Sequence, residues 1–234
     1  MQGPVAVGGR ALRRPGTICG IPGVVDDVAP FPLRLALLGD SIAHGTGALR
    51  SADALGPRLA ADLTADGFDV ELQVLAVPGA VSAQLAAQVR RAEPLRPDVS
   101  VVVIGANDLA HFVPADRAAA DLGAAVSALR AAGAAVVVVP APDMSSVPFV
   151  PPAFRAAVQA ACALLQQRQT KAAEAAGATV AHVAAEIGRA FTLDPALFSA
   201  DRFHPSSAGY RHIADALAPT VLAVARLRRD DAVA

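Results

Sequence analysis

The stretch "LALLGDSIAHGTG", residues 35–47, joins an aliphatic run to a turn of small and polar residues. The run stops at Gly39, and Asp40 and Ser41 follow directly. A continuous apolar run bounded by Gly is typical of a strand that is covered on both faces, as in a parallel sheet. An ordinary strand end followed by a helix cap has the same pattern, so this stretch alone leaves open whether Ser41 is a turn residue or a nucleophile.

The composition predicts a folded chain with a large apolar core. Hydrophobic residues make up 54% of the 234 residues and charged residues 18%, which suits one sizeable α/β domain. The formal net charge is −1 and no basic stretch is long enough to follow a phosphate backbone, so nucleic acid is not an expected partner. No segment has the roughly 18 uninterrupted apolar residues of a membrane-spanning helix.

The start of the chain and the cysteines bear on where the protein works. The first twenty residues contain Arg, Gly and Pro where a secretory signal has an apolar segment. Cys19 and Cys162 form no C-x-x-C motif and no disulfide framework, and Cys162 is expected to be a buried thiol in an alanine-rich helix. We therefore expect a cytoplasmic protein, and its oligomeric state is left open.

Beyond the first strand, apolar runs alternate with helix-type segments along the whole chain. This alternation predicts right-handed βαβ units and a parallel sheet with helices on both faces. The expected strands are 33–38, 70–76, 99–104, 134–139 and 178–183. The expected helices are 53–66, 82–93, 115–132, 153–176 and 206–227. Residues 1–32 are expected to form an N-terminal arm, 33–227 one domain, and 228–234 a tail. The run "RLRRDDAVA" at 226–234 is expected to be a frayed helix end with solvated arginines.

Polar or small residues follow each expected strand. Ligands of open parallel sheets bind beyond the carboxyl ends of the strands, so residues of functional importance should gather there. Ser41 follows the first strand, Gly79 the second, Asn107 the third, the segment 140–152 the fourth and His204 the last strand unit. These residues are therefore expected at one edge of the sheet.

These residue types could carry out nucleophilic catalysis. A serine hydroxyl needs a base, and His204 could act as one while Asp201, three residues earlier, holds its Nδ1–H. The backbone N–H groups of Ser41 and Gly79 and the side-chain amide of Asn107 could stabilise an oxyanion. Each has a plain alternative: a turn for Gly79, a helix cap for Asn107, and a surface turn for the Asp–His pair.

Four segments in this order resemble the SGNH, or GDSL, hydrolase family: Gly-Asp-Ser at 39–41, the turn with Gly79, Gly-Ala-Asn-Asp at 105–108 and Asp-Arg-Phe-His at 201–204. The resemblance spans residues 33 to about 225. It implies a flavodoxin-like three-layer α/β/α sandwich with a five-stranded parallel sheet.

The resemblance also implies the roles of five residues. Ser41 would be the nucleophile, His204 the base and Asp201 its partner, and Ser41, Gly79 and Asn107 would form the oxyanion hole. One departure is that the family often has an Asn shortly before its second-block glycine, and "LQVLAVPGA" at 72–80 has none. This departure concerns a local loop contact and leaves the implied triad unchanged.

Several neighbouring residues have expected supporting roles. Asp40 should brace the turn that holds Ser41, and Asp108 should brace its own loop. His44 and His111 either line the substrate cleft, pack at its rim or are exposed to solvent. No cluster of His, Cys and Asp has metal-ligand spacing, and no cofactor is expected.

The segment "PAPDMSSVPFVPP", residues 140–152, offers apolar side chains at the same sheet edge. Met144, Val147 and Phe149 either fill core between the sheet and the next helix or form the wall of an acyl pocket. The second alternative predicts an esterase that acts through an acyl-enzyme and prefers short to medium acyl chains on a small-molecule ester.

Two other functions remain open at this stage. An acyltransferase would use the same triad and pass the acyl group to an alcohol instead of water. A non-catalytic binding module would be indicated by the loss of a triad residue, and none is lost here.

Overall fold

The computed structural model describes residues 29–233, which form a five-stranded parallel sheet with the strand order β2-β1-β3-β4-β5. All neighbouring strands pair in parallel, and this order is that of a flavodoxin-like fold. The expected fold class is therefore confirmed. The strands are β1 (Phe31–Gly39), β2 (Phe68–Val74), β3 (Val99–Val103), β4 (Ala135–Val139) and β5 (Thr179–Val180).

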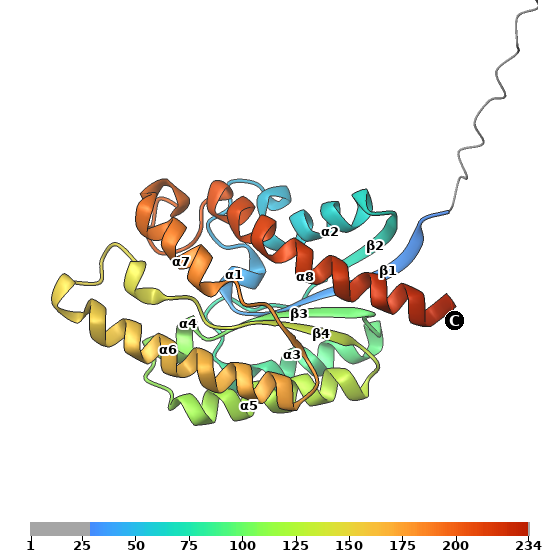
Figure 1. Cartoon of the computed structure of the whole chain (residues 1–234), viewed down its shortest axis with the longest axis horizontal. Coiled ribbons are helices and arrows are strands. Elements are labelled where there is room, and N and C mark those ends of the chain that lie inside the picture. The colour runs from blue at the N-terminus through green and yellow to red at the C-terminus, as the bar shows by residue number, and fades with distance from the viewer. Residues whose placement is uncertain (1–28, 234) are drawn as a thin grey trace, which may run out of the picture.

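Helices cover both faces of the sheet and make the three layers visible in Figure 1. The helices are α1 (Ser41–His44), α2 (Leu55–Ala65), α3 (Leu85–Ala92), α4 (Ala106–Ala110), α5 (Ala115–Ala131), α6 (Pro152–Ala175), α7 (Ala184–Leu193) and α8 (Ser207–Val233). Helices α2, α7 and α8 lie on one face, and α3, α5 and α6 lie on the other. The five expected helices are present, whereas α1, α4 and α7 are additional.

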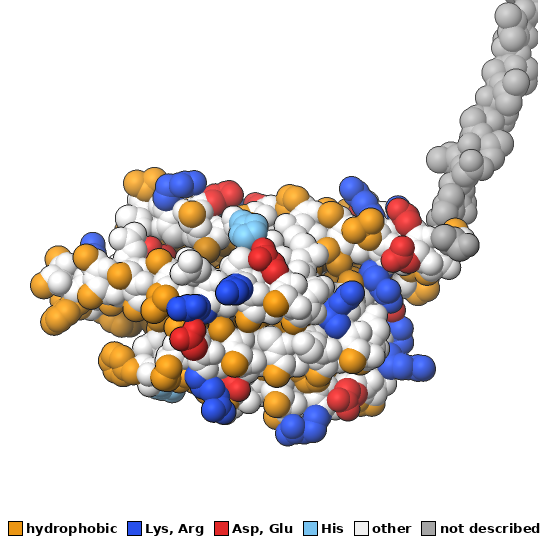
Figure 2. Space-filling view, turned by 60° about the horizontal axis from the view of Figure 1, so that its bottom comes forward, with side chains coloured by type: hydrophobic (Ala, Val, Ile, Leu, Met, Phe, Trp, Pro, Cys, Tyr) orange, Lys and Arg blue, Asp and Glu red, His pale blue; other side chains and the backbone are white. Residues whose placement is uncertain are grey.

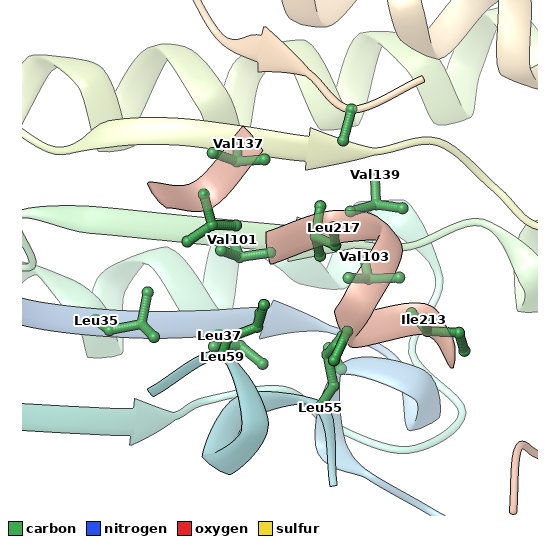
Figure 3. Packing of buried hydrophobic residues seen from close by; sticks show 14 of the residues in the cluster. Leu35, Leu37, Leu55, Leu59, Val101, Val103, Val137, Val139, Ile213 and Leu217 are labelled. Atoms are coloured by element: carbon green, nitrogen blue, oxygen red, sulfur yellow. The ribbon is translucent and has the colours of Figure 1, made fainter. Parts of the chain in front are cut away.

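The alternation of side chains along β1 shows how the sheet builds two cores. Leu35 and Leu37 belong to the cluster under α2 and α8, while Ala36 and Leu38 belong to the cluster under α3 and α5. Figure 3 shows the first cluster, in which residues of β1, β3 and β4 meet residues of α2 and α8. Each large apolar side chain that is fully buried in this way contributes about 1.5–3 kcal/mol to stability.

The two ends of the described chain differ from expectation. Residues 1–28 of the expected arm, with Cys19, lie outside the described residues, and Phe31 and Pro32 belong to β1. At the other end, α8 continues to Val233 and includes residues expected in the tail.

The prediction that the arginines near the end of α8 are only solvated is wrong. Arg226 pairs with Asp66 at the end of α2, and the Arg229 guanidinium lies 5.3 Å from the centre of the Phe68 ring. The longer helix carries these side chains across α2 and β2, where a long arginine stem can pack while its head group finds a partner.

The surface has mixed charge and some exposed apolar residues. In Figure 2, Lys and Arg side chains are spread among acidic and apolar ones, and hydrophobic side chains gather at the left end, where Figure 1 places the loop before α6. Phe149 and Phe154 of this region are exposed. Within residues 29–233, no helix combines the length and apolar character needed to cross a bilayer. The cytoplasmic location stays a prediction.

Candidate active site

The end of β1 is fixed by a glycine and a buried glutamine. Gly39 has φ +132°, and a Cβ atom there would lie 1.8 Å from the Val103 carbonyl oxygen, so only glycine fits. The Gln88 side chain of α3 accepts a hydrogen bond from the Gly39 N–H at 2.7 Å and donates to its carbonyl at 2.8 Å. Both backbone polar groups of Gly39 are therefore hydrogen-bonded to Gln88, which fixes the point in the chain from which Asp40 and Ser41 follow.

Ser41 is the first residue of the short helix α1. Asp40 caps this helix, because its Oδ1 accepts a hydrogen bond from the Ile42 N–H at 3.0 Å, and the expected bracing role is confirmed. Burial raises the pKa of Asp40 to about 6, although hydrogen bonds from Ile42 and Gly105 oppose the shift. As a first-turn residue, Ser41 has a backbone N–H with no acceptor inside its helix.

His204 and Asp201 form a direct pair in the turn before α8. The His204 Nδ1 and the Asp201 Oδ2 are 2.7 Å apart. Asp201 Oδ1 accepts hydrogen bonds from the backbone N–H groups of Phe203 and His204, each at 2.9 Å, and from the Ser199 hydroxyl at 2.7 Å. Burial alone would raise the pKa of Asp201, but these hydrogen bonds, led by that of His204, hold it well below its usual range. The carboxylate is thus ionised and able to accept the Nδ1–H.

One pocket brings Ser41 and His204 together. Both residues line it, and apolar side chains of the segment 140–147, of β3 and β4, and of α7 and α8 form most of the rest. Its volume is about 80 Å³, which is small beside the roughly 300–1,000 Å³ of pockets that enclose drug-sized ligands. Within residues 29–233 no hydrogen bond joins the Ser41 hydroxyl to the His204 ring. Such contacts often tighten only when substrate is bound.

Gly79 and Asn107 lie on two segments that contact each other. Gly79 is exposed with φ +81°, and a Cβ atom there would meet nothing within 4 Å. Asn107 lies in the first turn of α4, and its Nδ2 donates to the Ala80 carbonyl at 3.1 Å. Gly105 occupies the cap position of α4, so Asn107 does not cap this helix. One of the two amide N–H groups of Asn107 is thus used to hold the Gly79 turn, and the other is available.

The sequence comparisons agree with this geometry. The model of the GDSL-like lipase/acylhydrolase family matches residues 37–212, which is more than half of the chain. The chain belongs to this family. The family match begins within β1 and includes all the residues discussed above.

A curated member of the family is related over much of the chain. The GDSL-like esterase Rv1075c of Mycobacterium tuberculosis (strain ATCC 25618 / H37Rv) is 34% identical over 192 residues. These residues are 80% of the present chain and 61% of that esterase. The chain therefore spans less than two thirds of this relative.

Solved structures share the fold of this GDSL-like chain. TesA superposes with a TM-score of 0.65 at 19% identity, covering 82% of this chain and 99% of TesA. The acetylxylan esterase Axe2 of Geobacillus stearothermophilus gives a TM-score of 0.66 at 19% identity, with 82% and 95% of the two chains covered. The esterase EstA of Pseudoalteromonas sp. gives 0.61 at 20% identity, with 79% and 93% covered.

The residues of the 140–152 segment separate into two groups. Met144 and Val147 line the pocket shared by Ser41 and His204, and Val147 is also fully packed in the core. Phe149 is 60% exposed, does not line this pocket, and stacks on Phe203 with 5.7 Å between the ring centres. Phe149 therefore touches the site through Phe203, which lines the pocket.

The two candidate histidines also lie outside the pocket. His44, at the end of α1, and His111, just after α4, are both exposed, and neither is among the residues that line it. Among the alternatives for these side chains, the geometry favours solvent exposure.

Asp108 joins α4 to the segment that follows Gly79. Its carboxylate is fully buried and accepts hydrogen bonds from the Ser82 N–H at 3.1 Å and the Ser82 hydroxyl at 3.0 Å. Burial raises the pKa of Asp108, and the bonds from Ser82 partly offset this. The expected bracing role is confirmed, and its partner is now identified.

Two buried glutamines support this GDSL-like site and were missed by the sequence reasoning. Gln88 brackets Gly39, and Gln169 of α6 donates to the Ile104 carbonyl at 3.0 Å and accepts from the Ala141 N–H at 2.8 Å. A signal for Gln88 exists in the sequence, because it lies on the apolar stripe that Leu85, Val89 and Ala92 define on α3.

Proposed function

We propose that this chain is a serine esterase that hydrolyses a carboxylic ester through an acyl-enzyme. The observation that carries the proposal is the 2.7 Å contact between Asp201 and His204 at the wall of the pocket that Ser41 also lines. Membership in the GDSL-like lipase/acylhydrolase family supports the same chemistry.

In the proposed reaction, His204 acts as the general base. The ionised Asp201 accepts the Nδ1–H, so Nε2 carries the lone pair and can take the proton of the Ser41 hydroxyl. The serine oxygen then bonds to the ester carbonyl carbon, and the protonated His204 gives its proton to the leaving alcohol. In the second step His204 activates a water molecule, which releases the acid and restores Ser41.

We further propose that three donors stabilise the oxyanion. The Ser41 N–H belongs to the first turn of α1, the Gly79 N–H lies in a turn with no side chain in the way, and Asn107 brings an amide. Because Asn107 donates a hydrogen bond to the carbonyl of Ala80, next to Gly79, the Gly79 N–H and the Asn107 amide keep a fixed position relative to each other. Preorganised donors of this kind each contribute roughly 10²–10³ in rate.

The small apolar pocket supports a short acyl group as the preferred substrate. A volume of about 80 Å³ with Val139, Met144 and Val147 in its wall suits an acetyl group or a short chain, and among the described residues neither Lys nor Arg lines this pocket. Axe2, which shares the fold, is an acetylxylan esterase.

The test is a series of p-nitrophenyl esters from acetate to decanoate with the wild type and Ser41→Ala. We expect turnover that is highest for the shortest chains and lost in Ser41→Ala. Activity that survives in Ser41→Ala would overturn the proposal.

Acceptor alcohols in the same assay distinguish hydrolysis from acyl transfer. Because both reactions share the acyl-enzyme, they differ only in what attacks it. An esterase releases mostly free acid in the presence of the alcohols, whereas an acyltransferase yields the new ester.

A further inference from the structure

The loop after α1, residues 45–54, lies directly against the segment that carries His204. Its closest approach is at Gly47, where φ is +95°. A Cβ atom at Gly47 would lie 2.9 Å from the His204 Cβ and 2.5 Å from the Pro205 carbonyl oxygen. Carbon atoms that are not bonded pack at about 3.5–4.0 Å. Only glycine therefore allows the loop backbone to support the histidine this closely.

Hydrogen bonds tie this loop to α8 on both sides of Gly47. Before it, the Thr46 carbonyl accepts from the hydroxyl of the buried Tyr210 at 2.8 Å. After it, the Leu49 N–H donates to the Ser207 hydroxyl oxygen at 3.0 Å. Ser207 begins α8 and lies three residues beyond His204. The loop is thus bonded to the start of α8, the helix that follows His204 in the chain.

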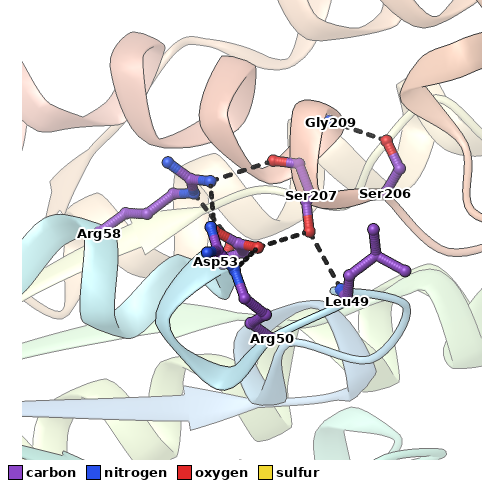
Figure 4. Close-up of polar contacts among 7 residues, drawn as sticks. All are labelled: Leu49, Arg50, Asp53, Arg58, Ser206, Ser207 and Gly209. Atoms are coloured by element: carbon purple, nitrogen blue, oxygen red, sulfur yellow. Dashed lines mark hydrogen bonds and ion pairs between the residues drawn. The ribbon is translucent and has the colours of Figure 1, made fainter.

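Asp53, near the end of the loop, adds a charged link to the same point (Figure 4). The Ser207 hydroxyl donates to Asp53 Oδ2 at 3.0 Å. Arg58 Nη2 contacts both Asp53 Oδ1, at 3.2 Å, and the Ser207 carbonyl, at 3.3 Å. Hydrogen bonds from Arg50 and Ser207 lower the pKa of Asp53 to about 2, so it is a carboxylate at neutral pH. Hydrogen bonds to a charged group are stronger than neutral ones.

From these contacts we infer that Gly47, Asp53 and Ser207 are positioning residues for the general base. Gly47 supports the His204 backbone, and Asp53 with Ser207 holds the supporting loop on α8. This inference rests on the proposed role of His204. It assigns to the loop a function in catalysis, although none of the three residues lines the pocket that Ser41 and His204 share.

The direct test compares Gly47→Ala with Gly133→Ala. Gly133, in the turn before β4, has φ +94°, and a Cβ there meets nothing within 4 Å. Both variants therefore carry the same backbone strain, and only Gly47→Ala pushes on His204. Since a displacement of about 1 Å can cost roughly 100-fold in rate, we expect kcat of Gly47→Ala to fall about 10–100-fold with KM nearly unchanged. Gly133→Ala should keep the wild-type kcat, and its loss of melting temperature should reflect the backbone strain alone.

Equal kcat values in the two variants would overturn the inference, and so would a loss of activity that follows only the unfolded fraction.

If Gly47→Ala does not fold, the inference can be tested with Ser207→Ala and Ser207→Thr instead. Ser207→Ala removes the hydroxyl that joins Asp53 to Leu49, whereas Ser207→Thr keeps it. We expect kcat to fall in the first variant and to recover in the second, and equal activity in both would contradict the inference.

Comparison with His204→Ala distinguishes a failure of this inference from a failure of the proposed function. If His204→Ala keeps full activity, the proposed function fails. If His204→Ala is inactive but Gly47→Ala behaves like Gly133→Ala, only the positioning role fails.

Discussion

At the scale of single residues, the two oxygens of Asp201 have separate tasks. Oδ1 accepts three hydrogen bonds from its own turn, from Ser199, Phe203 and His204, and so builds that turn. Oδ2 contacts the His204 ring and so sets its orientation. Because the two tasks lie on different atoms, one can be removed while the other is kept.

The substitution Asp201→Asn should remove the contact with the His204 ring and keep the hydrogen bonds of the turn. An asparagine oxygen can still accept the three bonds of the turn, but its amide nitrogen cannot accept the Nδ1–H of His204, so the ring is left in the wrong tautomer. We expect kcat at neutral pH to fall by about 10³–10⁴ with only a small loss of melting temperature, because the bonds of the turn are kept but are weaker to a neutral amide. Near-full activity in steady-state kinetics would mean that Asp201 only builds the turn.

Asp40 is a second residue whose charge can be tested, through its effect on the pH dependence of stability. Its pKa is raised by burial to about 6 in the folded protein, against 3.8 for the unconstrained side chain. A raised folded pKa means that this group favours folding at low pH, and that the advantage is lost as the pH rises from about 4 through 6.

Asp40→Asn removes this titration and can keep the cap of α1, because its amide oxygen can accept from Ile42. The free energy of unfolding of the wild type, relative to the variant, should fall by about 1–3 kcal/mol between pH 4 and pH 7. Urea unfolding at several pH values measures it. A difference that does not change with pH would show that Asp40 titrates normally.

At the scale of elements, two short helices present the site in the same way. Helix α1 starts after Gly39 and α4 starts after Gly105, both with φ +132°. A Cβ at Gly105 would lie 2.6 Å from the Ala141 Cβ, and Gln169 holds the neighbouring backbone as Gln88 holds Gly39. The sheet thus delivers Ser41 and Asn107 from strand ends that cannot shift without disturbing buried hydrogen bonds.

The segment between β4 and α6 sets the size of the proposed acyl pocket. Met144 lines the pocket and is only partly buried, so Met144→Ala should enlarge it with less loss of core packing than a change at the buried Val147. Each additional methylene that is buried gains about 0.8 kcal/mol, or roughly fourfold in kcat/KM. We therefore expect the preferred p-nitrophenyl ester to lengthen by one or more methylenes in Met144→Ala.

Phe149→Ala is the matched control in the same segment. Phe149 is mostly exposed and touches the site only through Phe203, so its loss should leave the chain-length profile unchanged. A shift in Phe149→Ala that equals the shift in Met144→Ala would show that acyl chains bind outside the pocket described here.

At the scale of the whole molecule, local patterns predicted the three layers of the fold. The apolar runs identified the five strands, and Ser41 at the end of β1 lies in one pocket with His204, which comes from the turn before α8. Helices α1 and α4 have four and five residues, too few for a helical period to be visible. Helix α7 has ten residues and is amphipathic, so its period is visible in the sequence, yet it is not among the expected helices.

The contacts that support the site could not be read from the sequence. Ser207 and Asp53 are 154 residues apart, and Gln169 reaches the Ile104 carbonyl over 65 residues. Such pairs depend on which strands and helices become neighbours, and no local spacing specifies them. The exposure of Phe149 has the same origin, because it depends on its contact with Phe203, 54 residues later in the chain.

The central claim is that Ser41 is a nucleophile activated by His204, and covalent labelling tests it most directly. The protein would be treated with a fluorophosphonate at neutral pH, and the modified peptide identified by mass spectrometry in the wild type and in His204→Ala. We predict one adduct, on Ser41, that forms at least about 100-fold more slowly in His204→Ala, because the serine then lacks its base. An adduct on another serine, or labelling of Ser41 at the same rate in both proteins, would contradict the account.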